Sequence, residues 1–262
     1  MATAQFRFYA ELNAFLKQPC RQQWCRRACP KGATVKNMVE AFGVPHTEID
    51  LILINGESVG FSHQLQEGER ISVYPHFSSL DISALTHLPL RPFRGEKFIA
   101  DAHLGWLAKH LRMLGFDVLY RNSYSDAEVA RIAADEERIV LTRDRDLLMH
   151  KAIVRGCYLH AVTGSAQRDE VLARFDLLGA MRPFCRCLNC NTLIREVDKK
   201  TVAHRVPLRI RQRHERFWEC GKCGQVYWSG SHVVRMESQI RQILDNAELA
   251  RKLALRNQSL PQ

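Results

Sequence analysis

The sequence predicts a mixed α/β protein built from three folded parts. The N-terminal third runs in the order strand, second strand, helix, strand, strand. From Lys97 onward, short apolar strands alternate with amphipathic helices. The last third holds two Cys-x-x-Cys pairs in a basic segment. A chain of 262 residues is long enough for more than one core. We therefore expect folded parts at residues 1–80, 96–179 and 180–236, with a C-terminal helix and tail at 237–262.

The composition is that of an ordinary globular protein, with 46% hydrophobic and 25% charged residues. No apolar run approaches the 18 residues of a membrane span, and the start of the chain lacks the pattern of a signal peptide. We expect a cytoplasmic protein without a membrane partner. The nine cysteines are clustered and odd in number. This favours metal-binding thiolates in a reducing compartment over disulfides.

The net charge of +10 is concentrated at the C-terminal end. Residues 179–262 carry 16 basic and 7 acidic side chains, which is nine of the ten excess charges. A basic region beside near-neutral ones is typical of nucleic-acid binding. A solvated basic surface is the alternative.

The N-terminal pattern consists of an alternating strand at 4–9, a helix at 33–45, and strands at 50–57 and 69–75. This order resembles the β-grasp (ubiquitin-like) fold, and the "INGE…LQEGERISVYP" ending is similar to that of sulfur carriers. Those carriers act through a free C-terminal Gly-Gly, whereas Tyr74-Pro75 continues into more chain. We expect a structural or protein-docking role instead. Pro89, Pro92 and Gly95 indicate a linker over residues 78–95.

The central part alternates strands with helices in a way that predicts a parallel sheet. Ligands of such sheets bind at the carboxyl ends of the strands. Neither GxGxxG nor GxxxxGK[ST] is present, which disfavours a dinucleotide or P-loop site. The expected strands lie at 97–101, 116–121, 138–142 and 156–162, and the expected helices at 103–115, 125–137 and 167–179.

Acidic residues stand at the predicted strand ends. Asp101 closes the first strand, Asp126 begins the second helix, and Asp144 follows the third strand with Asp146 two residues later. Carboxylates gathered at one edge would repel one another, and a hard divalent cation relieves that repulsion. Such a cation can also activate water against a phosphodiester.

Each of these acids has a structural alternative. Asp101 could cap its helix, and Ser125 with Glu128 has the spacing of a capping box that begins beside Asp126. Asp144 and Asp146 could pair with the interleaved arginines at 143 and 145.

The cysteine pairs are separated by 29 residues, as in a structural zinc site. The four ligands are Cys187, Cys190, Cys220 and Cys223, and Cys185 is expected to lie outside the site. The three N-terminal cysteines at 20, 25 and 29 match no zinc spacing, and an inserted basic loop is expected there.

The segment between the zinc-ligand pairs is basic. Lys199, Lys200, Arg209, Arg211 and Arg213 are the candidates for phosphate contacts. Aromatic residues flank the second pair and could stack on bases, although at least two should pack the small core. These aromatics are Phe217, Trp218, Tyr227 and Trp228.

The stretches KFIADAHLGWLAKHLRMLGFDVLYRN and SDAEVARIAADEERIVLTRDRDLL resemble the PIN-like ribonuclease domain named for the C-terminal part of the Mut-seven exonucleases. The zinc ribbon and the β-grasp leader complete that family's pattern over residues 4–236. The resemblance implies Mg²⁺ or Mn²⁺ held by Asp101, Asp144 and Asp126, with Glu128 and Asp146 as further catalytic candidates. It also implies that the Thr142 hydroxyl steadies the Asp144 loop. PIN-like domains are often dimeric, so a homodimer is compatible with it.

We therefore expect a central PIN-like parallel-sheet domain between a β-grasp domain and a zinc ribbon, acting as a metal-dependent ribonuclease on RNA. The alternative is a non-catalytic RNA-binding or adaptor protein with an inactive PIN-like domain. The RNA substrate, the cutting mode and the role of His232 do not follow from the sequence.

Overall fold

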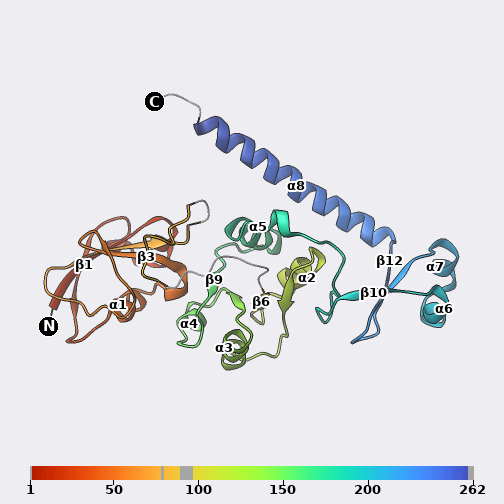
Figure 1. Ribbon diagram of the computed structural model, residues 1–262, viewed down its shortest axis with the longest axis horizontal. Coiled ribbons are helices and arrows are strands. Elements are labelled where there is room, and N and C mark those ends of the chain that lie inside the picture. The colour runs from red at the N-terminus through yellow and green to blue at the C-terminus, as the bar shows by residue number, and fades with distance from the viewer. Residues whose placement is uncertain (1, 78–79, 89–96, 259–262) are drawn as a thin grey trace. The chain divides into compact units, whose positions relative to one another are not determined.

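The computed structural model describes residues 2–77, 80–88 and 97–258, with side chains described up to residue 246 (Figure 1). The chain divides into two compact units. The first comprises Met1–Gly105 and Tyr120–Val162, and the second comprises Trp106–Leu119 and Thr163–Gln262.

The first unit begins with a five-stranded sheet in the order β2-β1-β5-β3-β4. The central strands β1 and β5 run parallel, and the other neighbours run antiparallel. This topology is that of a β-grasp fold. The strands are β1 (Ala2–Phe8), β2 (Cys25–Cys29), β3 (Ile49–Ile54), β4 (Glu57–Ser58) and β5 (Arg70–Pro75), with α1 at Val35–Ala41 and the 3-10 turns η1 (Ala10–Phe15), η2 (Gln18–Cys20) and η3 (His46–Glu48).

The core of this domain lies between α1 and one face of the sheet. Phe6 and Phe8 alternate along β1 with the outward Gln5 and Arg7, as a half-buried strand requires. Val35 and Val39 of α1 belong to the same buried cluster. Thr34 caps the helix in a capping box with Asn37, which explains why the helix begins at residue 35.

The middle of the predicted linker at 78–95 contacts the β-grasp domain. Leu88 is buried in the β-grasp core, and the Thr86 hydroxyl donates to the carbonyl of Asp50 at 2.8 Å. Residues 80–88 therefore pack on the domain, because their apolar and hydroxyl side chains find partners there. Residues 78–79 and 89–96 of the predicted linker lie outside the described residues.

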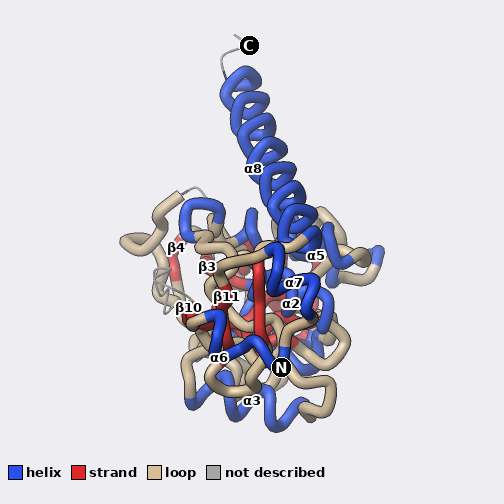
Figure 2. Tube along the Cα trace, turned by 90° about the vertical axis from the view of Figure 1, so that its right-hand side faces the viewer, coloured by secondary structure: helices blue, strands red, loops and turns tan. Residues whose placement is uncertain are grey.

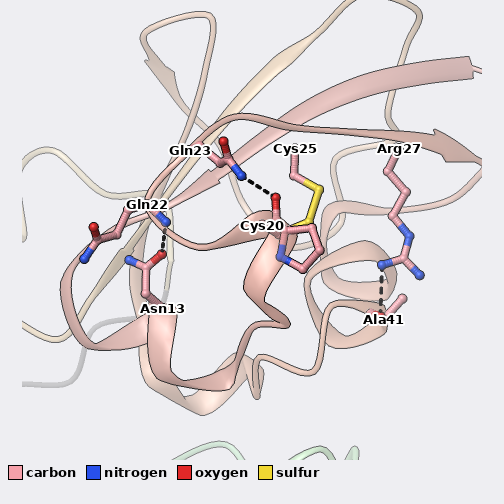
Figure 3. Close-up of a disulfide and its surroundings, with 8 residues drawn as sticks. Asn13, Cys20, Gln22, Gln23, Cys25, Arg27 and Ala41 are labelled. Atoms are coloured by element: carbon pink, nitrogen blue, oxygen red, sulfur yellow. Dashed lines mark hydrogen bonds between the residues drawn. A yellow bond between two sulfur atoms is a disulfide. The ribbon is translucent and has the colours of Figure 1, made fainter.

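The three N-terminal cysteines differ from the expected loop of free thiols. Cys20 and Cys25 form a disulfide (Figure 3). Cys29 is buried in the domain core. Residues 25–29 form the edge strand β2 rather than a loop. The expectation that the cysteines would serve as thiolates is wrong for this pair, since Cys20 and Cys25 lie within bonding distance of each other across a short turn.

The same unit holds the parallel strands β6 (Lys97–Ala100), β8 (Ile139–Thr142) and β9 (Gly156–Tyr158), with β8 in the middle. All four residues of β8 are buried. Helix α3 (Asp126–Asp135) precedes β8, and the short helix α4 (Arg145–Leu148) follows it. Helix α4 was not predicted, because four residues carry too little periodicity to reveal a helix.

The second unit contains most of α2 (Gly105–Met113), then β7 (Asp117–Leu119), α5 (Gly164–Arg174) and the turn η4 (Leu178–Ala180). Thr163 caps α5, which therefore begins earlier than the predicted residue 167. Buried Arg112 of α2 donates to the carbonyls of Leu188 and Asn189 at 3.0 and 2.9 Å. This contact ties α2 to the first pair of the clustered cysteines.

The cysteine-rich part is a three-stranded antiparallel sheet in the order β10-β11-β12. Figure 2 shows the long helix α8, which begins at Ser231, earlier than the predicted residue 237. Ile240 and Ile243 on this helix are buried. No helix in the described ranges is long and apolar enough to cross a membrane. The elements are β10 (Ile194–Val197), α6 (Lys199–Val202), η5 (Ala203–Arg205), α7 (Leu208–Arg213), β11 (Phe217–Cys220), β12 (Val226–Trp228) and α8 (Ser231–Gln258).

Candidate functional site

The carboxyl ends of β6 and β8 lie at the same edge of the parallel sheet. Ala100 is in register with Leu141, and the backbone N–H of Asp101 donates to the carbonyl of Leu141 at 3.0 Å. Asp101 therefore leaves β6 beside the end of β8, where Thr142 stands. The topology places these side chains at the edge where ligands of parallel sheets bind.

One hydroxyl connects the two strand ends. Thr142 is fully buried, and its Oγ1 donates to Oδ2 of Asp101 at 2.7 Å. The same oxygen accepts from the backbone N–H of Asp144 at 2.9 Å. The expectation that Thr142 steadies the Asp144 loop is confirmed, and the structure adds the bond to Asp101. The second oxygen of the Asp101 carboxylate accepts from the N–H of Ala102.

Asp144 also has a structural role, since it is the N-cap of α4. Its Oδ1 accepts from the N–H of Asp146 at 2.8 Å and from that of Leu147 at 3.4 Å. The side chain is exposed, and in the described part of the chain its Oδ2 has no hydrogen-bond partner. The alternative that Asp144 and Asp146 pair with the neighbouring arginines is not observed among the described residues.

The start of α3 uses one of the predicted acids as a cap. Oε2 of Glu128 accepts from the N–H and the hydroxyl of Ser125, at 2.8 and 2.9 Å. The hydrogen bond from the Ser125 backbone lowers the pKa of the Glu128 carboxyl and keeps it ionised. Asp126, two residues earlier, is exposed and makes no side-chain hydrogen bond within the described residues.

The acids are not gathered into a tight cluster. Among the described residues, the four cysteines of the C-terminal part are the one group of three or more His, Cys, Asp or Glu side chains close enough together to hold a metal ion. Asp101 and Asp144 are joined through Thr142, whereas Asp126 has no bond to either. The metal-ligand role of these acids stays a prediction.

Two residues near Asp101 were missed by the sequence analysis. The hydroxyl of Tyr120 donates to the carbonyl of Ala102 at 2.9 Å. A Cβ on Gly105 would lie 2.6 Å from that hydroxyl, so only glycine fits beneath the tyrosine ring. Together they fix the turn that follows Asp101. A glycine at the start of an otherwise strong helix pattern was the available signal.

The four predicted zinc ligands meet in space. The Sγ atoms of Cys187, Cys190, Cys220 and Cys223 lie within 4.8 Å of one another. Cys190 Sγ is 3.2 Å from Cys220 Sγ, and Cys187 Sγ is 3.6 Å from Cys223 Sγ. A tetrahedral zinc with Zn–S bonds of about 2.3 Å needs sulfurs about 3.8 Å apart. The donor set therefore fits a structural zinc.

Tyr227 supports this cluster from outside. Its hydroxyl lies 3.1 Å from Cys187 Sγ and accepts from the N–H of Leu188 at 3.1 Å. Burial opposes ionisation of the Cys187 thiol, but hydrogen bonds from Tyr227 and from the amides of Cys190 and Asn189 outweigh it and lower its pKa to about 6. The sequence indicated Tyr227 only as a base-stacking candidate, and the structure places it at the cysteine cluster.

The other aromatics divide between core and surface. Phe217 and Trp228 pack with Val202 and Val206, which confirms that at least two of the four serve the small core. The guanidinium of Arg216 lies 5.2 Å from the ring centre of Trp218. Cys185 lies outside the cluster and points to the carbonyl of Gly115, as expected.

The basic candidates differ in how they are paired. Lys199 forms an ion pair with Glu215 at 2.8 Å, which leaves less of its charge for an anion. Lys200, Arg209 and Arg213 are exposed and, in the part of the chain that is described, form no ion pair. Arg211 is half-buried, and its Nε is buried without a hydrogen-bond partner.

Family comparisons agree with this architecture. The model of the Mut7-C RNAse domain family matches residues 96–240, which is 145 of the 262 residues. The chain belongs to that family. The Mut7-C ubiquitin model matches residues 1–81. No curated protein matches the Mut7-C chain.

The N-terminal part is similar to small solved structures. Small archaeal modifier protein 1 from H. volcanii is 18% identical, with 29% of this chain and 98% of that chain covered and a TM-score of 0.24. A putative molybdopterin converting factor subunit 1 from Pyrococcus furiosus gives the same identity, coverage and score.

Proposed function

We propose that this Mut7-C protein is a metal-dependent ribonuclease that hydrolyses RNA phosphodiester bonds. The observation that supports it best is the bonded set Asp101–Thr142–Asp144 at the ends of two neighbouring parallel strands. A hydroxyl that orients one carboxylate and the backbone of another is typical of a site where two acids act together. The family's description as an RNAse domain supports the same chemistry.

In this proposal Asp101, Asp126 and Asp144 hold Mg²⁺ or Mn²⁺. The donors are hard oxygens, and Mg²⁺ keeps several water ligands, so carboxylates that are not tightly clustered suit it. The ion would supply activation of water and compensation of negative charge on the phosphodiester. Thr142 would hold Asp101 and the Asp144 loop in place, and Asp146 would offer a further free carboxylate.

Glu128 has a smaller part in the proposal than the sequence suggested. Its carboxylate is bound to Ser125 in the capping box, so it would position the start of α3 and with it Asp126. The RNA itself would be held by the exposed basic residues of the ribbon, of which Arg209 and Arg213 on α7 are the best placed.

The test is cleavage of end-labelled RNA by the full-length protein with Mg²⁺, Mn²⁺ or EDTA. Asp101→Asn and Asp144→Asn should each slow cleavage by roughly 100-fold or more, because metal-supplied charge compensation is worth several kcal/mol. Asparagine is itself a good N-cap, so Asp144→Asn should keep α4 intact. Asp135→Asn is the matched control, since Asp135 is exposed on α3 and, among the described residues, pairs only with Arg131.

Cleavage that persists in EDTA, or that is equal in Asp144→Asn and the wild type, would contradict the metal-site assignment. Binding of RNA without cleavage in any metal would favour the alternative, a non-catalytic RNA-binding protein in which Asp144 and Glu128 serve only as helix caps.

A further inference from the structure

The β-grasp domain separates its charges along the chain. Residues 1–36 hold seven basic and one acidic side chain, and residues 37–90 hold one basic and seven acidic ones. The net charge of the domain is therefore near zero although residues 1–36 are strongly basic. These residues include the edge strand β2 and its neighbour β1.

The basic side chains meet on the outward face of three neighbouring strands. Gln5 of β1 is in register with Arg26 of β2 on one side and with Arg70 of β5 on the other. The next outward residue of β1 is Arg7. Since α1 and the core occupy the opposite face, these arginines lie on the side of the sheet that faces away from α1. Arg26 and Arg70 are two strand spacings, about 10 Å, apart.

Aromatic rings flank these arginines on the same face. The guanidinium of Arg70 lies 4.4 Å from the ring centre of Trp24, and that of Arg7 lies 5.2 Å from the ring centre of Tyr9. Tyr9 and Tyr74 stack in parallel with their ring centres 4.3 Å apart. We name this surface the open face: Arg7, Tyr9, Trp24, Arg26, Arg70 and Tyr74.

The open face lacks negative charge of its own. None of the residues of β1, β2 and β5 is acidic. Within the described residues, Arg7, Arg26 and Arg70 form no ion pair. The acid beside it, Glu67, bonds to the N–H of Thr3 at the far end of β1 from Arg7. Three guanidinium groups on one surface, with no carboxylate partner among the described residues, favour the binding of an anionic ligand.

The loop that presents Trp24 is held in shape. The N–H of Gln22 donates to Oδ1 of Asn13 at 2.7 Å (Figure 3). The Asn13 amide donates to the carbonyls of Phe8 and Ala10. The Cys20–Cys25 disulfide closes the same loop. A loop ordered before binding loses less conformational entropy when a ligand arrives.

We propose that the open face of the β-grasp domain is a second RNA-binding site, specific for single strands. Arginines bind phosphates, and half-buried aromatics on a sheet stack on unpaired bases. A duplex would hide its bases from these rings. The choice of RNA over another polyanion rests on the proposed ribonuclease function.

The test uses the full-length Asp144→Asn protein and a fluorescent single-stranded RNA. Its length is about 4–16 nucleotides, the range that one single-strand-binding OB fold covers. Arg26→Ala with Arg70→Ala should weaken binding and lower the salt slope of the dissociation constant by about 1.4, from about 0.7 per lost phosphate contact. Trp24→Leu should weaken binding roughly fivefold or more with no change in slope.

The matched control is Lys31→Ala with Lys36→Ala, which removes the same charge from the same domain. Lys36 lies on α1, across the core from the open face. This control should bind nearly as well as the parent protein. Thermal melting shows whether each variant is folded. Crosslinking of the parent protein to RNA that carries 4-thiouridine is a second measurement, and it needs no substitution at the open face. Crosslinks should map to peptides that contain Tyr9, Trp24 or Tyr74.

Equal RNA binding by the arginine double variant and the lysine double variant would overturn the inference, and so would crosslinks confined to residues 180–236. The open face would then be a candidate site for a protein partner. Neither binding nor crosslinking requires turnover. RNA bound at the open face, together with no cleavage by the wild-type protein in any metal, would therefore contradict only the proposed function. Cleavage by the wild-type protein, with no contribution of the open face to RNA binding, would contradict only this inference.

Discussion

The hydroxyl of Thr142 donates to the carboxylate of Asp101 across two neighbouring strands, at 2.7 Å. Thr142 is fully buried, and the lone pair of the same oxygen accepts from the N–H of Asp144. A single atom thus sets the relation between a side chain at the end of β6 and the loop after β8. Valine would fill the same space in a strand, so the threonine is there for its hydroxyl.

Thr142→Val should therefore destabilise the protein and disturb the proposed site. The change removes two partly buried hydrogen bonds, the one from Thr142 to Asp101 and the one from Asp144 to Thr142, and each is worth about 0.5–1.5 kcal/mol. Urea unfolding measures that loss, and RNA cleavage should fall in parallel. Thr142→Ser retains the hydroxyl and is the control. If the valine variant were as stable and as active as the wild type, the bond would have no consequence.

Gly105→Ala should also destabilise the protein, against the usual trend. In a helix, alanine is normally better than glycine by about 1 kcal/mol. Here the new Cβ would lie 2.6 Å from the Tyr120 hydroxyl, so we expect a loss of about 1–3 kcal/mol from overpacking. Tyr120→Phe in the same chain removes the closest atom and should recover part of the loss. Gly179→Ala, with no atom within 4 Å of its Cβ, should be close to neutral.

These two sites show what the sequence could predict and what it could not. The strand ends at Asp101 and Asp144 followed from periodicity, because β6 and β8 are apolar runs with abrupt polar ends. The contact between Thr142 and Asp101 joins residues 41 positions apart, and no local pattern encodes it. The same holds for Tyr120 over Gly105.

The cysteines also divide into a group whose arrangement the sequence predicted and a pair whose arrangement it did not. The spacing of Cys187, Cys190, Cys220 and Cys223 predicted their cluster, because short knuckles bring such pairs together. The Cys20–Cys25 disulfide was missed, since a spacing of five residues fits a loop as well as a bond. The packing of Leu88 in the β-grasp core was missed as well, because this burial depends on tertiary contacts that the local sequence does not reveal.

Removal of zinc should unfold the ribbon, because four thiolates without their metal repel or protonate. A strong chelator should abolish the order of β10–β12, visible as loss of amide-exchange protection there. Cys220→Ser should lose bound zinc, measured by atomic absorption. Cys185→Ser is the control, since Cys185 lies outside the cluster, and it should keep one zinc per chain. Zinc retained by Cys220→Ser would contradict the four-cysteine site.

RNA binding by the ribbon should depend on whether an arginine is already paired. Arg209→Ala with Arg213→Ala removes two exposed charges without an ion pair among the described residues, so binding should weaken and its salt slope should fall by about 1.4. Lys199→Ala with Arg216→Ala removes the same charge from the same domain. Those two side chains already pair with Glu215 and Glu196, so their loss should change the slope much less. Arg211 is left unchanged because its Nε is buried.

Fluorescence anisotropy over a series of salt concentrations gives both slopes. Equal slopes for the two double variants would mean that net charge alone attracts RNA and that α7 makes no direct phosphate contact.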